Sequence, residues 1–237
     1  MKKKLIFIIP AAVIAALLIA FFIFAGTYYR ADPSASEALV SDEAVAVTKT
    51  DYGWYFDGPS DSDALVFYPG ARVDEAAYAP LLHSLAANGI DVCLVKMPFH
   101  LALFGMNKAG EALDGLSYEN CYIGGHSLGG AIAANYAAEH GDSLAGVILL
   151  AAYPTKQLDN DLLLISVSAS EDGVISRDKL EDGRNYAPER YVEYVIEGGN
   201  HAQFGDYGEQ SGDGTALISR EEQQRQTVDV IIKNICR

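Results

Sequence analysis

One serine of the chain lies in a sequence context that suits a nucleophile. Ser127 is the centre of the string GHSLG at residues 125–129, between an apolar run and a segment of helical pattern. A serine on such a sharp strand-to-helix turn has a strained backbone, and its neighbours must lack side chains because the strand and the helix pass close by. The pattern predicts that the Ser127 hydroxyl is presented at the end of a strand and attacks a carbonyl carbon.

A serine hydroxyl is a poor nucleophile until a base takes its proton, and the chain offers five histidines. His201 follows the last strand-like run in a Gly-rich loop, from which a side chain can reach over the carboxyl edge of a sheet. His126 lies inside the turn and is expected to point elsewhere, while His83 and His140 fall on segments of helical pattern. We therefore predict His201 as the base, with His100 as the alternative.

A carboxylate must orient the imidazole. The run LLLISVSAS ends at Glu171 and Asp172, and Asp172 precedes a glycine that gives it a turn to occupy. Asp172 also lies between Ser127 and His201 in the chain, which is the order found where the serine occupies a strand-to-helix turn. We predict Asp172 as the acid, and Glu171 and Asp206 are the alternatives.

Two backbone N–H groups must stabilise the oxyanion that develops on the substrate. One belongs to the residue after the nucleophile, Leu128, and the other to the loop after the apolar run at 64–68, where Gly70 lets the backbone turn back. Ala71 or Arg72 is the expected second donor. The Arg72 side chain either pairs with neighbouring acids on the surface or binds a carboxylate of the substrate.

Two apolar segments follow strand ends and are expected to line the substrate pocket. They are residues 97–107, with Phe99 and His100, and residues 204–207, with Phe204. Ordinary core packing is the alternative for each of these side chains.

The rest of the sequence alternates between strand-like and helical patterns. Two antiparallel strands are expected at 44–49 and 52–57, further strands at 64–68, 90–95, 119–124, 145–151, 161–167 and 191–196, and the clearest helices at 74–88, 128–140 and 220–234. Several of the later strands are apolar on both faces, as strands covered by helices on each side are. The predicted fold class is α/β, a doubly wound and mainly parallel sheet with helices on both faces.

The strings GHSLG, PGAR at 69–72, EDGV at 171–174 and GNH at 199–201 resemble the α/β-hydrolase superfamily. The chain from about residue 44 to 237 looks like its compact bacterial branch, which is related to dienelactone hydrolases and small carboxylesterases. The resemblance implies Ser127 as nucleophile, Asp172 as acid and His201 as base, with no metal or organic cofactor. The chain departs from the pattern of the superfamily in two respects. Dienelactone hydrolases proper use a cysteine as the nucleophile, where this chain has a serine, and only a short segment here could form a lid.

The resemblance implies a serine hydrolase that cleaves a small ester, thioester or lactone through an acyl-enzyme. The missing lid favours an open pocket over a lipase that acts at oil interfaces. An acyltransferase or a carbon–carbon hydrolase could use the same three residues. A non-catalytic binding module tethered to a membrane is the alternative from another functional class.

The N-terminus predicts a membrane anchor. Three lysines at residues 2–4 precede an uncharged run at 5–26, which as a helix would be about 33 Å long and could span a bilayer. Because the lysines stay cytoplasmic, we expect a single-pass protein of the cell membrane with an uncleaved anchor, a linker at 27–43 and the hydrolase domain at 44–237 outside the cytoplasm.

The overall charge restricts the partners. The formal net charge is −15, and the first thirty residues carry four cations and no acid, so the body is more acidic still. Such a body repels phosphate backbones, which excludes nucleic acid and leaves a small-molecule substrate and the membrane as partners. The three cysteines, Cys93, Cys121 and Cys236, have no spacing typical of a zinc site or a redox pair.

Overall fold

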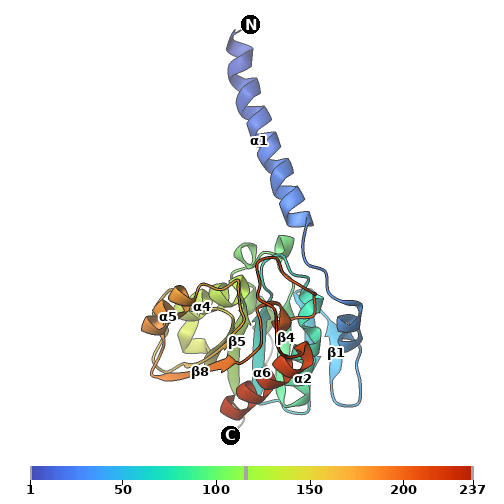
Figure 1. Cartoon of the computed structure of the whole chain (residues 1–237), viewed down its shortest axis with the longest axis vertical. Coiled ribbons are helices and arrows are strands. Elements are labelled where there is room, and N and C mark those ends of the chain that lie inside the picture. Colours follow the sequence, from blue (N-terminus) through green and yellow to red (C-terminus); the bar gives the residue numbers. More distant parts are fainter. Residues whose placement is uncertain (1, 115–116, 236–237) are drawn as a thin grey trace.

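A single eight-stranded sheet forms the centre of the body (Figure 1). The computed structural model describes the backbone of residues 2–114 and 117–235. The strands are β1 Ala46–Lys49, β2 Gly53–Asp57, β3 Asp63–Tyr68, β4 Ile90–Val95, β5 Asn120–His126, β6 Gly146–Leu150, β7 Leu163–Ala169 and β8 Arg190–Ile196. Their spatial order is β1-β2-β4-β3-β5-β6-β7-β8, antiparallel from β1 to β4 and parallel from β4 to β8. The predicted mainly parallel sheet is confirmed.

The central strands bury both of their faces. In β3, Leu65 and Phe67 face one apolar core, while Val66 and Tyr68 face another. Alternate side chains of a strand point to opposite faces, so a strand that is apolar throughout needs a cover on each side. Helices provide both covers, as predicted.

The helices divide between these two cores. α2 (Ala79–Ala87) and α6 (Arg220–Ile235) pack on one face, and α3 (Lys108–Leu113) and α4 (Leu128–His140) pack on the other. α5 (Arg177–Gly183) follows β7. The helix expected at 74–88 is shorter than predicted: Asp74 caps a 3-10 turn, and the α-helix begins only at Ala79.

The N-terminal helix α1 (Lys2–Gly26) projects away from the body (Figure 1). The predicted anchor at 5–26 falls on this helix, although the side chains of residues 5–9, 11 and 12 lie outside the described part. Over the part of the chain that the structure describes, no helix has an apolar stretch long enough to cross a membrane.

Residues 27–43 differ from the free linker that the sequence predicts. They contain a 3-10 helix, Pro33–Leu39, and Ala35 in it is fully buried. Asp32 pairs with Arg220 at 2.6 Å, and the segment also bonds to the loop after β3. This segment therefore packs on the body.

The parallel strands β3 to β8 all end at one edge of the sheet. The loops that leave this carboxyl edge carry the residues for which the sequence predicts chemistry. Between β6 and β7 only residues 151–162 intervene, and they contain no helix. The connection between β6 and β7 thus adds no helix above the centre of the sheet.

Candidate active site

Ser127 occupies a strained turn between β5 and α4. Its backbone has φ 54° and ψ −126°, a region that costs a residue with a side chain about 1–3 kcal/mol. A Cβ on Gly125 would lie 2.5 Å from the Tyr68 carbonyl oxygen, and a Cβ on Gly129 would collide with the Pro69 carbonyl. The two flanking glycines are therefore required for the strand and helix to approach this closely.

The His201 imidazole is oriented by the Asp172 carboxylate. His201 Nδ1 lies 2.7 Å from Asp172 Oδ2, and both side chains are almost completely buried. Asp172 Oδ1 accepts hydrogen bonds from the backbone N–H groups of Val174 (2.8 Å) and Ile175 (2.9 Å). His201 Nε2 has no hydrogen-bond partner among the described residues. The ring nitrogen that faces away from the carboxylate is thus not engaged elsewhere.

Ser127 and His201 border the same pocket, which has a volume of about 300 Å³. The serine and the imidazole do not form a hydrogen bond with each other in this conformation. The remaining lining residues are mostly small or apolar: Leu128, Ala131, Ala151, Ala152, Tyr153, Val174, Ile175, Ser176 and Lys179. The pocket can thus accept a small uncharged group, and Lys179 is its one cationic lining residue among those described.

The loop after β3 presents one of the two predicted oxyanion donors. The Arg72 N–H donates to the His100 carbonyl oxygen at 2.7 Å and is not available to a substrate. Among the described residues none accepts a hydrogen bond from Ala71 N–H. Leu128 is the first residue of α4, where backbone N–H groups have no partner within the helix. The pair that remains for an oxyanion is Leu128 and Ala71.

The Arg72 side chain is directed at the end of α1. Its Nε donates to the Thr27 carbonyl oxygen at 2.7 Å, and its guanidinium lies 4.5 Å from the centre of the Phe24 ring. The His100 ring stacks on Tyr28 at 3.8 Å. Neither side chain lines the Ser127 pocket, so this conformation brings neither of them to a substrate there.

The two phenylalanines predicted to bind substrate lie elsewhere. Phe204 is fully buried, with its ring 5.6 Å from the His126 ring, and belongs to the core. Phe99 is exposed and packs against Phe21 of α1. The core alternative therefore describes Phe204, and Phe99 belongs to an exposed surface outside the Ser127 pocket.

The alternative acids have other partners. Glu171 accepts a hydrogen bond from the neighbouring Ser170 hydroxyl. Asp206 accepts from Gln224 at 2.6 Å and pairs with Arg220 at 3.2 Å. Burial raises the pKa of the Asp206 carboxyl above its ordinary value.

His126 is closer to the site than the sequence suggests. It is buried, and its ring lies 4.4 Å from the ring of His201. Its Nδ1 is hydrogen-bonded to the Tyr78 hydroxyl at 2.9 Å, and the same hydroxyl accepts the Gly70 N–H at 3.0 Å. Burial, reinforced by the neighbouring His201, holds the pKa of His126 well below its ordinary value. A neutral His126 thus links His201 to the loop that carries Gly70 and Ala71.

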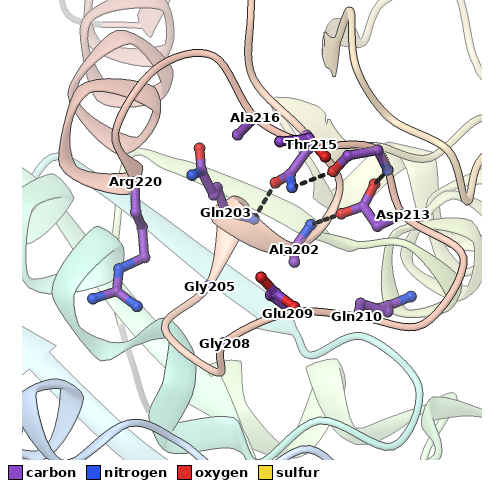
Figure 2. A pocket seen from close by; sticks show the side chains of 12 residues that line it. Ala202, Gln203, Gly205, Gly208, Glu209, Gln210, Asp213, Thr215, Ala216 and Arg220 are labelled. Atoms are coloured by element: carbon purple, nitrogen blue, oxygen red, sulfur yellow. Dashed lines mark hydrogen bonds between the residues drawn. The ribbon is translucent and has the colours of Figure 1, made fainter.

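Asp213 supports the loop of His201, a role that the sequence did not reveal. Its carboxylate accepts hydrogen bonds from the N–H groups of His201 (3.2 Å) and Gly173 (3.1 Å), so it joins the loops that carry His201 and Asp172. It also accepts one from the Ala202 N–H at 2.8 Å (Figure 2). The Gly-Asp-Gly string at 212–214 signals a turn, but not which N–H groups the carboxylate meets. A second pocket of about 390 Å³ borders the same loop and includes neither Ser127 nor His201 in its lining.

The described residues hold one acidic group close enough to share a metal ion, at Asp57, Asp61 and Asp91. Asp91 and Asp57 lie at the start of β4 and the end of β2, which is the edge opposite Ser127. The Asp91 oxygens already accept hydrogen bonds from Gly58 N–H and from two tyrosine hydroxyls. Cys93 and Cys121 are free thiols, and Cys236 lies outside the described residues. Burial raises the pKa of the Cys93 thiol to about 11.

Comparison with known proteins agrees with this architecture. Residues 64–225 match the model of the alpha/beta hydrolase family. No curated protein sequence matches the chain. Among solved structures, the chain is similar to Est1E from Butyrivibrio proteoclasticus, with 12% identity, a TM-score of 0.58 and coverage of 82% of this chain and 100% of the other.

Two further structures share the fold. A dienelactone hydrolase from Anabaena variabilis has 12% identity, a TM-score of 0.56 and coverage of 81% of this chain and 97% of the other. A membrane phospholipase A, described as a bacterial virulence factor, has 10% identity, a TM-score of 0.58 and coverage of 99% of both chains. Since the family match spans more than half of the residues, the chain belongs to the alpha/beta hydrolase family and is a hydrolase.

Proposed function

We propose that the chain is a serine hydrolase that cleaves a small ester, thioester or lactone through an acyl-enzyme on Ser127. One observation carries most of the proposal. Ser127 and His201 border one pocket, and the His201 Nδ1 is held by the buried Asp172 carboxylate. A hydroxyl on a strained turn, an imidazole and an orienting carboxylate are the three groups that serine acyl transfer needs.

The reaction proceeds in two halves. His201 Nε2 takes the proton of the Ser127 hydroxyl as its oxygen attacks the carbonyl carbon, and the same imidazole returns the proton to the departing alcohol or thiol. Water then attacks the acyl-serine with help from His201 and releases the acid. Asp172 fixes the imidazole so that Nε2 is the nitrogen that exchanges the proton, and it stabilises the imidazolium that forms.

The negative charge on the carbonyl oxygen meets the N–H groups of Leu128 and Ala71. The Leu128 N–H lies at the N-terminus of α4, whose dipole favours an anion there. Arg72 N–H is a less suitable donor because it is bonded to the His100 carbonyl. Each such donor contributes about 10²–10³-fold to kcat in serine hydrolases.

A fluorophosphonate probe tests the nucleophile, with Ser127→Ala as the variant. Ser143→Ala is the matched control, because Ser143 is exposed and bonds only within its own turn. We expect labelling of the wild type and of Ser143→Ala, and none of Ser127→Ala. A folded wild type that is not labelled would instead favour a binding module.

Product analysis separates hydrolysis from the related reactions. Incubation with p-nitrophenyl esters of increasing chain length should release free acid and p-nitrophenol, and short chains should be preferred because the pocket is small. Transfer of the acyl group to an added alcohol or amine in place of water would indicate an acyltransferase.

We further propose that residues 5–26 anchor the enzyme in the cell membrane, with the body outside the cytoplasm. Most of the large apolar side chains between Val13 and Phe24 are exposed, and they lie on all sides of α1. This pattern is typical of a helix covered by lipid. The similarity to a membrane phospholipase A over 99% of both chains is consistent with this proposal. Protease added to intact spheroplasts should digest the body, and alkaline carbonate should leave the chain in the membrane pellet.

A further inference from the structure

Four large apolar side chains are exposed together on the loop that follows β4. They are Phe99 (44% exposed), Leu103 (57%), Phe104 (49%) and Met106 (46%), and we call them the apolar rim. The loop that carries the rim follows the carboxyl end of β4, on the side from which α1 leaves the body (Figure 1). An exposed cluster of this kind on a soluble surface marks an interaction site.

The rim is in direct contact with α1. The Phe21 ring lies 5.3 Å from the Phe99 ring and 5.8 Å from the Phe104 ring, and Phe22 lies 6.2 Å from Phe99. Phe21 precedes the last residue of α1, Gly26, by five residues, which is about 7–8 Å along the helix axis. The rim therefore lies beside a part of α1 that is well inside its apolar stretch.

The residues between this contact and the body are of types that suit a lipid–water interface. Tyr28 follows α1 and stacks on His100, and the Arg30 guanidinium lies 5.3 Å from the Tyr28 ring. The Arg72 guanidinium lies 4.5 Å from the Phe24 ring. Tyrosine and arginine are typical of the headgroup level of a bilayer, where one end is apolar and the other hydrated.

We propose that the apolar rim rests in the lipid surface beside α1, so that the ester cleaved at Ser127 is an amphiphile drawn from that surface. If α1 lies in the bilayer up to Gly26, its contacts with Phe99 and Phe104 fix these side chains about 7–8 Å deep, at the boundary of headgroups and acyl chains. The acidic body makes a zwitterionic surface a better match than an anionic one. The proposal rests on the proposed function and on the anchor.

The position of the catalytic pocket leads to the substrate class. Ser127 and the rim both lie at the carboxyl edge, and α4, which begins next to Ser127, contacts the 3-10 turn Ala102–Phe104. Leu128 and Val174 line the pocket and are exposed apolar side chains. An acyl ester with a polar headgroup could move from the lipid surface into the pocket without crossing bulk water. A site that stays at the surface also needs no lid that opens there.

Fluorescence quenching tests the location of the rim without using activity. In the full chain carrying Trp54→Phe, which removes the single native tryptophan, the variant Leu103→Trp is reconstituted into phosphatidylcholine vesicles with acyl chains brominated near the headgroup. We expect Leu103→Trp to lose about half or more of its emission relative to unbrominated vesicles. The matched control is Val195→Trp on the far edge strand β8, which is similarly exposed and should keep its emission.

An unquenched Leu103→Trp in a chain that floats with the vesicles would overturn the proposal. A blue-shifted emission that depends on protein concentration and not on bromine would also overturn it, because it would assign the rim to a second copy of the chain. Either result leaves the fluorophosphonate test of Ser127 unaffected, so failure of this proposal and failure of the proposed function are distinguishable.

Kinetics test the substrate class. In vesicles, the double variant Leu103→Glu and Met106→Glu should hydrolyse a phospholipid that carries one short acyl chain, which the small Ser127 pocket can accept, about tenfold or more slowly than the wild type, because carboxylates resist insertion among acyl chains. Its turnover of soluble p-nitrophenyl acetate should stay within about twofold, because neither residue lines the Ser127 pocket. Val195→Glu should change neither rate. Equal rates of the double variant and the wild type on the phospholipid, or no hydrolysis of it by a wild type that cleaves the soluble ester, would contradict the inference.

Discussion

The two sides of the proposed catalytic pocket are held by different parts of the chain. On the base side, Asp172 and Asp213 fix the His201 loop, and all of these residues belong to the C-terminal part of the body. On the oxyanion side, the loop after β3 is bonded to residues 27–29, which continue directly from α1. The comparison indicates that the hydrogen bonds to His201 itself come from the folded body alone, whereas the loop that carries Ala71 is bonded directly to the segment next to the N-terminal helix.

The bonds on the oxyanion side resemble the pairing of a short strand. Tyr29 N–H donates to the Arg72 carbonyl at 2.7 Å, Asp74 N–H donates to the Tyr29 carbonyl at 2.9 Å, and Tyr29 and Val73 form an isolated parallel bridge. Arg72 has a positive φ of 56°, which a residue with a side chain adopts only when its surroundings enforce it. Residues 27–29 supply part of that enforcement.

Removal of the charge at Asp172 should have the largest effect. Asp172→Asn keeps the size of the side chain but can hold the His201 imidazole in the wrong tautomer, with its proton on Nε2. The value of kcat should therefore fall by about 10³–10⁴-fold. Ester turnover and a thermal melt are the measurements, with the exposed Asp161→Asn as the control. A loss of less than about tenfold in a fully folded variant would indicate that another residue orients the base.

Asp213→Ala tests the second support of the base side. Its carboxylate accepts three hydrogen bonds from the backbone N–H groups of other loops, and hydrogen bonds to charged groups are among the stronger ones. We expect the free energy of unfolding in urea to fall by about 2–4 kcal/mol, together with kcat. The exposed Asp142→Ala is the control, and a stability equal to that of the wild type would show that water replaces this carboxylate.

The sequence predicted the centre of the molecule well, and for a physical reason. A buried parallel strand is an apolar run with turn residues at both ends, so β3 to β7 can be recognised from the local sequence. A nucleophile on a tight turn requires glycines at fixed positions, so the neighbourhood of Ser127 can be recognised as well. α3 and α5, with six and seven residues, are too short to show a helical period and were not predicted.

Contacts between distant segments were not predictable in the same way. Asp32 pairs with Arg220, and Ala35 is buried, although the composition around them is that of a linker. His126 packs against His201 because β5 and the loop after β8 meet at one edge of the sheet, which the spacing along the chain does not reveal. The hydrogen bond from the Arg72 side chain to the Thr27 carbonyl was likewise not predictable, because it depends on where α1 ends.

The neutral state of His126, which lies between the two sides, predicts a dependence of stability on pH. Its pKa in the folded state lies well below the ordinary value of 6.5, so the unfolded chain binds a proton that the folded chain does not. The stability contributed by neutral His126 is therefore full above about pH 6.5 and is lost as the pH falls below it, by up to about 1.4 kcal/mol per pH unit.

Urea unfolding at several pH values between 5 and 8 measures this slope. His126→Gln should be less stable than the wild type at pH 8, because it removes a buried ring, and the difference should shrink toward pH 5. The exposed His140→Gln should keep the slope of the wild type. A difference between His126→Gln and the wild type that stays constant with pH would mean that His126 binds its proton equally in the folded and unfolded states, so that folding does not lower its pKa.

The oxyanion side should show the smallest effect, because several contacts share its support. Arg72→Met keeps the length of the side chain but removes the hydrogen bonds to Thr27, while the bonds between Tyr29 and the loop remain. We expect kcat for a soluble ester to fall by about 3–10-fold, with little change in KM, since a displaced Ala71 N–H would weaken the transition state more than the bound substrate. The midpoint of the pH profile should not move, because His201 and its two aspartates are untouched.

Arg184→Met, which removes an exposed arginine paired with Glu193 far from the loop, is the matched control. A shifted pH midpoint in Arg72→Met would show that the two sides are coupled through Tyr78 and His126. The inference that the His201 loop and the Ala71 loop are held independently would then be wrong.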